Sequence, residues 1–338
     1  MDIGIYTFAD VVPGASAGER LRHLVEEMEL ADQVGLDVFG VGEHHRPDYA
    51  VSAPAVALAA GAARTKRIRL TSAVTVLSSD DPVRVFQEFS ILDGISDGRA
   101  EIMAGRGSFI ESYPLFGYNL DDYDALFAEK LGLLLELRDK ERVTWAGELR
   151  SPLQNAGVYP RPVQKQIPVW IAVGGTPQSV VRAASLGLPM ALAIIGGDPV
   201  RFAPYFALYR DAWAKAGRDP KDIKLSLNMH GFVADTATEA KNIFYPPHTE
   251  VMNRIGRERG WPPQGRDHFE AAAGPAGNLI IGDPALVAAR IVELHSIFKN
   301  DRILIQMAIG AMPHKDVMRA IELLGGKVAP TVRAAIKS

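Results

Sequence analysis

Apolar residues in this chain fall into short continuous runs, separated by longer stretches in which apolar residues recur every three or four positions. The first run, residues 2–8, precedes a stretch in which Leu21, Leu24, Val25, Met28 and Ala31 have helical spacing. Further runs typical of buried strands cover residues 37–42, 68–77, 100–107, 167–175, 189–195, 225–234 and 302–309. Helical spacing returns between or after them near residues 53–64, 82–95, 120–139, 177–186, 199–216, 284–299 and 314–325.

This alternation of strand and helix patterns predicts the fold. Strands that are apolar along their whole length are buried on both faces, as in parallel sheets covered by helices. Eight successive units favour a closed (β/α)8 barrel, the TIM barrel, over an open doubly wound sheet, although periodicity alone leaves closure open. We therefore expect an α/β protein with a single barrel domain over residues 1–338.

Two segments interrupt the alternation. Residues 141–166 hold three prolines and no helical spacing, so we expect a hairpin or a long loop inserted before the fifth strand. Residues 244–277 are rich in proline, glycine and arginine, so we expect a second insertion there, after the seventh strand. Irregular segments of this length are often functional lids, and a static surface excursion or an oligomer contact is the alternative.

Composition excludes several classes of function. The chain has 37 Lys and Arg residues against 40 Asp and Glu, so it lacks the basic field that holds a nucleic-acid backbone. It has no cysteine, which excludes disulfides, thiolate metal sites and cysteine nucleophiles. Its apolar runs fall short of the ~18 residues of a membrane span, and its first residues are not those of a secretory signal. We expect a soluble cytoplasmic protein that binds neither nucleic acid nor membrane.

Candidate catalytic residues occur in "GEHHRPDY", residues 42–49, directly after the second strand. The active site of a TIM barrel lies at the carboxyl ends of its strands, where Glu43, His44 and His45 fall. Adjacent residues of an extended chain point to opposite sides, so His44 and His45 are poorly placed to share a metal ion, and we expect no metal. A histidine that only packs within the loop is the alternative for His44. His230, in the seventh strand, is a weaker candidate.

A candidate anion site lies in "VGGTPQSVVRAA", residues 173–184, where a strand meets a helix. Thr176 stands at the expected N-cap, Pro177 at the first helical position and Ser179 in the first turn. Such a helix start offers backbone N–H groups, hydroxyls and a favourable dipole to a phosphate, and Arg106 after the fourth strand can supply the matching cation. An ordinary turn between strand and helix, with Arg106 in an ordinary ion pair, is the alternative.

Together these residues resemble the bacterial luciferase-like monooxygenase family over nearly the whole chain. The resemblance rests on "GEHH" at 42–45, on residues 67–107, on "FGYN" at 116–119, on residues 168–190 around "GGTP", and on "GDPALVAARI" at 282–291. Residues 67–107 are its most specific part. Members of this family are (β/α)8 barrels that use reduced FMN or a deazaflavin coenzyme, which agrees with the fold predicted from the periodicity.

The resemblance implies roles for the matching residues. It places His44 beside the reactive edge of the flavin, with Glu43 or His45 orienting it. It implies a non-prolyl cis peptide between Ser72 and Ala73, under the isoalloxazine ring. The luciferases carry a cysteine where this chain has Gly105, so light emission is not implied. The implied phosphate-binding set is Arg106, Gly174, Gly175, Thr176 and Ser179.

The implied function is a flavin-dependent monooxygenase, in which reduced FMN and O2 oxidise a small organic substrate. His44 would act as general acid or base. A nicotinamide-binding fingerprint is absent from the sequence, so we expect a separate flavin reductase to supply reduced FMN through a transient contact. We also expect a homodimer or a higher homo-oligomer.

Three alternatives remain at this stage. The first is a deazaflavin-dependent dehydrogenase on the same barrel, which would transfer a hydride without oxygen. The second is a protein that binds flavin without turnover. The third is a metal-dependent barrel hydrolase, which needs a ligand cluster that the sequence does not display.

Overall fold

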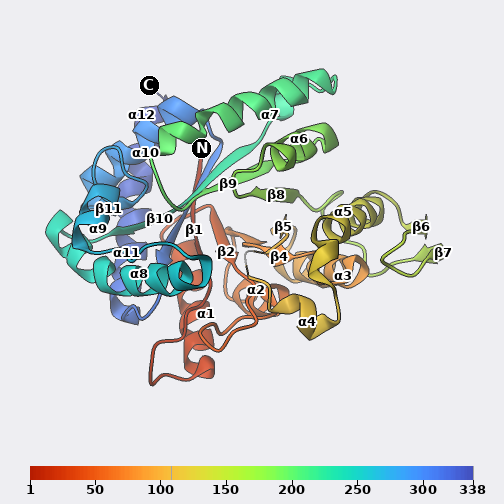
Figure 1. The fold of residues 1–338 in the computed structure, drawn as a ribbon, viewed down its shortest axis with the longest axis horizontal. Coiled ribbons are helices and arrows are strands. Elements are labelled where there is room, and N and C mark those ends of the chain that lie inside the picture. Colours follow the sequence, from red (N-terminus) through yellow and green to blue (C-terminus); the bar gives the residue numbers. More distant parts are fainter. Residues whose placement is uncertain (108, 338) are drawn as a thin grey trace.

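Eight parallel strands form a closed ring in this computed structural model, which describes residues 1–107 and 109–337 (Figure 1). The ring closes because β10 pairs with β9 on one side and with β12 on the other. The predicted (β/α)8 barrel is therefore confirmed. Around the ring, the strands are β1 (Asp2–Thr7), β2 (Val38–Val41), β3 (Arg69–Ser72), β5 (Ala100–Gly105), β8 (Val169–Val173), β9 (Met190–Ile194), β10 (Leu225–Val233) and β12 (Arg302–Ala308).

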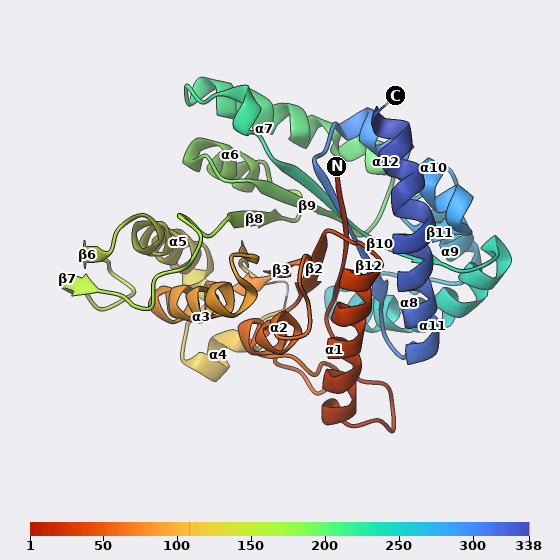
Figure 2. The ribbon, with the colours of Figure 1, turned by 180° about the vertical axis from the view of Figure 1, so that it is seen from behind.

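Helices surround the strands, as the front and back views show (Figure 2). The helices that follow the barrel strands are α1 (Ala17–Gln33), α2 (Pro54–Ala62), α3 (Pro82–Ser96), α5 (Tyr123–Asp139), α6 (Pro177–Leu186), α7 (Ala203–Lys215), α8 (Ala237–Arg259), α10 (Pro284–Phe298) and α11 (His314–Leu323). Shorter helical elements are α4 (Ser112–Phe116), α9 (Arg266–Ala272), α12 (Ala329–Lys337), η1 (Leu120–Asp122), η2 (Pro199–Phe202), η3 (Pro220–Asp222) and η4 (Leu324–Val328). Short strands β4 (Thr75–Val76) and β11 (Ile280–Gly282) extend the sheet beside β5 and β10.

Asp-Pro pairs start several of these helices. The Asp81 carboxylate accepts a hydrogen bond from the Val83 amide at 2.8 Å, and the Asp283 carboxylate accepts one from the Ala285 amide at 3.0 Å. Proline at the first helical position loses nothing, because its missing N–H would have no partner there. The same arrangement at Asp198 and Asp219 starts η2 and η3. The caps at Asp81, Asp198 and Asp283 follow strands, whereas the cap at Asp219 precedes β10.

The interior of the barrel is packed by alternate residues of each strand. Its apolar cluster consists of Tyr6, Val38, Ala73, Met103, Trp170, Ala191 and Leu304. A larger cluster, formed by the opposite strand faces and the helices, surrounds the ring. Interior residues near the C-terminal ends are therefore the ones that can meet a ligand in the barrel mouth.

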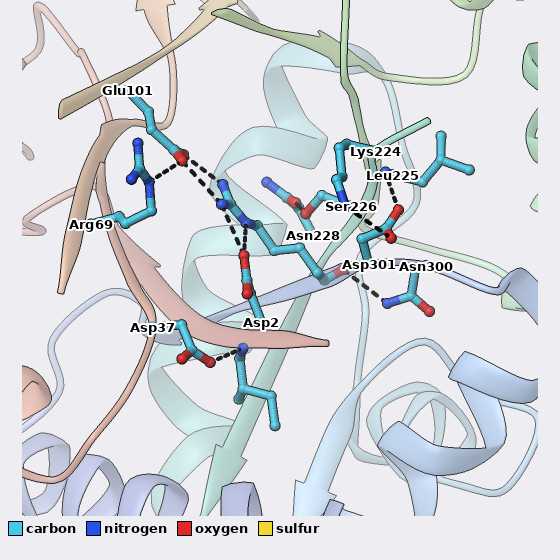
Figure 3. Close-up of polar contacts among 12 residues, drawn as sticks. Asp2, Asp37, Arg69, Glu101, Lys224, Leu225, Ser226, Asn228, Asn300 and Asp301 are labelled. Atoms are coloured by element: carbon cyan, nitrogen blue, oxygen red, sulfur yellow. Dashed lines mark hydrogen bonds and ion pairs between the residues drawn. The ribbon is translucent and has the colours of Figure 1, made fainter. Parts of the chain in front are cut away.

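An ion-pair network closes the N-terminal end of the barrel (Figure 3, where Glu101, Arg69 and Asp2 are labelled). The buried Arg302 contacts Glu101 at 2.6 Å and Asp2 at 3.1 Å, and Arg69 also binds Glu101. Burial alone would raise the pKa of Glu101, but the guanidinium groups of Arg302 and Arg69 outweigh it and hold the pKa below its usual value. The Arg302 guanidinium also lies 4.3 Å from the ring centre of Trp170. This end of the barrel is thus a charged plug in which the groups pair with one another.

The two predicted insertions differ in the structure. Residues 141–166 contain the antiparallel hairpin of β6 (Arg142–Trp145) and β7 (Leu153–Gly157), one of the two forms expected. The expectation of an irregular segment from residue 244 was wrong, because α8 runs without a break to Arg259 through Pro246 and Pro247.

The register of α8 explains why it is a helix. Thr236 caps it by accepting from the Glu239 amide at 3.2 Å. Its buried residues then recur at helical spacing and include both an imidazole and a proline. Packing of this face outweighs the hydrogen bonds that two prolines remove. The buried residues are Ala240, Phe244, Pro247, His248, Val251, Met252 and Gly256.

α8 runs from the side of β10 toward α1 (Figure 1). Near its middle, the Pro247 carbonyl and Val251 lie so close to Gly310, after β12, that a side chain there would collide with them. Near its C-terminal end, Arg254 contacts Asp48 at 3.1 Å and Glu258 contacts Arg46 at 2.6 Å. The helix therefore spans the ends of β10 and β12 and reaches the loop after β2.

Candidate functional site

Arg106, Thr176 and Ser179 meet at the C-terminal face of the barrel, as the sequence predicts. The Arg106 guanidinium donates to Ser179 Oγ at 3.2 Å and reaches Thr176 Oγ1 at 3.5 Å. The two hydroxyls are themselves 2.8 Å apart. Thr176 is the N-cap residue of α6, but its side chain makes no capping bond, so its hydroxyl is turned toward Arg106 instead. A cation and two hydroxyls thus converge at a helix N-terminus.

The two glycines before α6 shape this site differently. Gly175 has a φ of +105°, which residues with a side chain rarely adopt, and its carbonyl accepts from Tyr205 Oη at 2.6 Å. Gly174 is exposed, and a Cβ added there would meet nothing within 4 Å. The backbone conformation therefore favours glycine at 175, while at 174 the absence of a side chain leaves the backbone open to an approaching ligand.

One acidic residue competes for the same cation. Arg106 forms a close ion pair with Asp124, whose side chain is 70% exposed. The exposed carboxylate is well hydrated, so the pair is worth little and can be exchanged for a phosphate. The chemistry of the site, a guanidinium with two hydroxyls at a helix start, fits a phosphate monoester such as that of FMN.

His44 is buried among aromatic rings. Its imidazole stacks on Tyr49, with ring centres 4.3 Å apart, and meets the edges of Phe8 and Phe109 at 4.4 and 5.2 Å. Neither ring nitrogen has a hydrogen-bond partner within residues 1–107 and 109–337. Burial lowers the pKa of His44 to about 3, with small contributions from His45 and Arg46, so the ring is neutral at physiological pH.

Glu43 and His45 form a separate pair. Glu43 Oε1 lies 2.9 Å from His45 Nε2, and Glu43 Oε2 accepts from the Val76 amide at 2.8 Å. Glu43 makes no hydrogen bond to His44 among the described residues, because its two oxygens are engaged by His45 and by the Val76 amide; an orienting role for Glu43 or His45 stays a prediction. His44 itself packs against Phe8 and Tyr49.

The region of Ser72 and Ala73 departs from the expectation in one detail. The non-prolyl cis peptide joins Ala73 to Val74, not Ser72 to Ala73. Ser72 is still part of β3, its hydroxyl bound to the Met103 carbonyl at 3.1 Å, and the Ala73 amide still donates to the Val41 carbonyl at 2.7 Å. The chain therefore follows the sheet through the Ala73 amide and leaves it only afterwards.

Sequence reasoning missed part of the interior wall on the other side of the mouth. Tyr6 of β1, Gln306 of β12 and His230 of β10 occupy one register layer, because Gln306 pairs with both of the others. His230 Nδ1 lies 3.3 Å from Nε2 of His248, which α8 contributes. Only His230 stood out in the sequence. The alternation of inward and outward residues along these strands could have placed Tyr6 and Gln306 in the barrel interior. His248 could not be placed in this way, because the two prolines before it predict a loop rather than a helix.

Two further findings limit the kinds of site. Among the described residues, no group of three or more His, Cys, Asp or Glu side chains is arranged to hold a metal ion. In the same part of the chain, no helix has the length and apolar character needed to cross a membrane.

Comparisons with known proteins agree with this geometry. The family model described as luciferase-like monooxygenase matches residues 1–300. The monooxygenase RslO1 from Streptomyces bottropensis is similar over 98% of this chain and 99% of its own, with 27% identity and a TM-score of 0.85.

Two more distant structures share the fold. The oxygenating constituent of 3,6-diketocamphane monooxygenase from Pseudomonas putida, a type II Baeyer–Villiger enzyme in complex with FMN, has 18% identity and a TM-score of 0.79 over 98% of both chains. The coenzyme F420-dependent tetrahydromethanopterin reductase from Methanopyrus kandleri has 18% identity and a TM-score of 0.73, over 98% of this chain and 99% of its own. With its sequence match from residue 1 to residue 300, this chain belongs to the luciferase-like monooxygenase family.

Proposed function

We propose that this protein is a flavin-dependent monooxygenase that uses reduced FMN and O2 to oxidise a small organic substrate. Monooxygenase and oxidoreductase members of the family support an enzymatic role. The observation that carries the choice of flavin is the convergence of Arg106, Thr176 and Ser179 at the start of α6, about a third of the way around the barrel mouth from His44.

The phosphate of FMN would be held by this cluster. The guanidinium of Arg106 binds phosphate oxygens through two parallel N–H groups, and the Thr176 and Ser179 hydroxyls donate beside it. The open backbone at Gly174 and Gly175 lets the anion approach the helix start. In this proposal, Ala73 contributes a small side chain to the floor under the ring, and Ser72 supports that floor through its bonds to β5.

His44 would act on the substrate as a neutral imidazole. Its nitrogens have no partner within the described residues, so they are free to accept a proton from a ligand or to donate a hydrogen bond to it. The aromatic wall of Phe8, Tyr49 and Phe109 excludes water from this side of the mouth. Bound reduced FMN would supply two electrons to O2; the protein residues supply position, dryness and proton control.

A separate flavin reductase would supply the reduced FMN, since the chain has no nicotinamide fingerprint. The rival is a deazaflavin-dependent dehydrogenase, because a phosphate-bearing deazaflavin fits the same anion site and the reductase of M. kandleri shares the barrel.

Reconstitution tests these choices. The purified protein is titrated with FMN and with the deazaflavin coenzyme, and oxygen uptake is followed with each reduced form in the presence of a panel of small organic compounds. We expect tight FMN binding and uptake of O2 that depends on one class of compound, with an oxygen atom found in the product by mass spectrometry. Binding of the deazaflavin alone, with hydride transfer and no oxygen uptake, would establish the rival. FMN binding without any turnover would leave only a carrier role.

A further inference from the structure

Three polar side chains of adjacent strands face the barrel interior, and each has a hydrogen-bonding atom with no partner among the residues that the structure describes. Gln306 is in register with Tyr6 of β1 and with His230 of β10, so all three lie on the same face as the interior residue Leu304. Neighbouring strands are about 5 Å apart, so the three inward side chains converge toward the barrel axis. We call Tyr6, Gln306 and His230 the donor layer.

The interior layers below this one are satisfied. Arg302 pairs with Glu101 and Asp2, and the Ser226 hydroxyl donates to Asn228 Oδ1 at 2.9 Å. Buried polar groups in folded proteins normally have a hydrogen-bond partner in this way, so a buried polar group without one indicates a special role. The donor layer is therefore different from the rest of the interior and lies closer to the mouth.

The hydrogen on the His230 ring can be located from its neighbour. Burial lowers the pKa of His230 to about 4 and that of His248 to about 3, so both rings are neutral and each carries one N–H. Nδ1 of His248 is sealed from solvent and has no partner. In folded proteins a buried N–H without a partner is rarer than a buried acceptor without one, which favours a bare nitrogen at this position. His248 therefore carries its hydrogen on Nε2 and donates it to His230 Nδ1, 3.3 Å away.

This assignment leaves His230 with its own hydrogen on Nε2. That nitrogen has no partner among residues 1–107 and 109–337, yet it is not sealed as His248 Nδ1 is, so it keeps some access to solvent. The same holds for the Gln306 amide, whose Oε1 is buried without a partner while Nε2 retains access. Burial raises the pKa of Tyr6 above its usual value, so its hydroxyl keeps its hydrogen. All three groups present N–H or O–H donors.

We propose that the donor layer binds an oxygen atom of the substrate, either a carbonyl or an oxyanion, and that Tyr6, Gln306 and His230 are substrate-contacting residues. The assignment rests on the proposed function in one respect, namely that the substrate enters the barrel mouth. Convergent donors select an oxygen acceptor, because a ligand that lacks one leaves them unpaired. His248 is a positioning residue, which acts by fixing the hydrogen of His230.

The experiment compares acetophenone with α-methylstyrene, in which a C=CH2 group replaces C=O with nearly the same shape. Dissociation constants are measured by ligand-observed NMR on the protein loaded with oxidised FMN and on the flavin-free protein. We expect the wild type to bind acetophenone roughly tenfold more tightly or better. Tyr6→Phe and Gln306→Met, which change shape little, should each reduce this preference roughly two- to tenfold, the usual range for one net hydrogen bond. Gln87→Met, on the exposed side of α3, is the matched control and should leave the preference unchanged.

Equal affinities for the two compounds, binding of neither, or a preference that survives both substitutions would overturn the assignment. A loss of FMN and riboflavin affinity in Tyr6→Phe and Gln306→Met, with the acetophenone preference intact, would show that these donors hold flavin carbonyls, and it would overturn the assignment too. A wild type that binds no FMN but still prefers acetophenone would refute the proposed function and support the donor layer, so the two failures are distinct.

Discussion

Glu43 binds His45 at 2.9 Å and leaves His44 to its aromatic neighbours. The two adjacent histidines therefore make different kinds of contact: His45 is hydrogen-bonded and His44 is packed against aromatic rings. His45 belongs to a hydrogen-bonded chain that ends at the Val76 amide, in β4, while His44 is a neutral ring held by packing at the mouth. This difference makes their substitutions separable by experiment.

For His44→Ala we expect normal folding, normal FMN affinity and substrate oxidation reduced by ~10²-fold or more, the usual contribution of a positioned proton-transfer group. The anion site is on other strands, so the substitution does not touch it. Oxygen-coupled turnover, FMN titration and thermal melting on the same protein measure the three quantities. Normal turnover by folded, FMN-bound His44→Ala protein would refute the catalytic role.

For His45→Ala we expect the opposite balance. Removing the imidazole leaves one oxygen of the buried Glu43 unpaired, which costs about 1–3 kcal/mol of folding free energy. Activity per folded molecule should fall far less than in His44→Ala. Urea denaturation gives the free energy, and a variant as stable as the wild type would show that the pair contributes little.

Arg106→Ala should weaken FMN much more than riboflavin, because the lost contact is to phosphate. A charged hydrogen bond is worth ~1.5–3 kcal/mol, so the dissociation constant of FMN should rise roughly tenfold to a hundredfold. Asp124→Asn is the matched variant: it frees Arg106 from its carboxylate and should tighten FMN without changing riboflavin. Equal weakening of FMN and riboflavin by Arg106→Ala would remove Arg106 from the phosphate site.

The ion pairs at the end of α8 should control how often that end opens. Glu258→Gln and Arg254→Gln remove contacts to Arg46 and Asp48, each worth about 0.2–1 kcal/mol because they are partly exposed. Trypsin cleavage after Arg257 should then be faster by a few-fold, and high salt should speed cleavage of the wild type in the same way. Glu322→Gln, which removes a pair within α11, is the control. A cleavage rate that neither the two substitutions nor salt changes would argue against a lid. So would a rate that stays the same when flavin and substrate are both bound.

Glu101→Gln should be the most destabilising of these changes, by about 3–5 kcal/mol, because it removes the buried partner of Arg302 and leaves only the half-exposed Asp2 to compensate its charge. The pKa of Glu101 is depressed in the folded protein, so its contribution is present above the unfolded value of about 4.5 and is lost as the pH falls through the lower folded value. The difference in stability between wild type and variant should therefore shrink below about pH 4.5. Glu29→Gln, in an exposed pair with Arg64, should cost less than about 1 kcal/mol.

His248→Phe should change the position of a hydrogen rather than the fold. With ¹⁵N-labelled histidine, NMR should find His230 protonated on Nε2 in the wild type and distributed over both nitrogens in the variant, whose Nδ1 has lost its donor. His230 should stay neutral from pH 8 to pH 5, since burial lowers its pKa to about 4. A wild-type His230 with its hydrogen on Nδ1 would contradict the orientation of the pair.

The fold was predictable because its signal is repeated along the chain. Continuous apolar strands and helical spacing each recur, so one misread segment does not change the architecture. The meeting of Arg106 with Thr176 and Ser179 was predictable for a local reason: Thr176, Pro177 and Ser179 carry the start of a helix in their own residue types, and Arg106 follows a strand whose end must lie on the same face.

The remaining features depend on contacts between distant segments. α8 was misread because Pro246 and Pro247 predict a break, and only packing against the barrel shows that the helix continues. The partner of Glu43 is decided by which side of an irregular loop each imidazole faces, which alternation alone does not give. Tyr6 and Gln306 are 300 residues apart in the sequence and meet only because the barrel closes between its first and last strands.

α8 carries both the residues that fasten it over the mouth, Arg254 and Glu258, and the imidazole of His248 that reaches into the interior. The same helix therefore also determines where His230 keeps its hydrogen. Thermodynamic linkage then gives a testable consequence. If packing of α8 against the barrel strengthens binding of a ligand oxygen, the bound oxygen must stabilise that packed position of α8 by the same free energy. Backbone hydrogen exchange along α8 should slow when acetophenone binds and should not change when α-methylstyrene binds. The stability of α8 would then report whether the bound ligand carries a carbonyl oxygen.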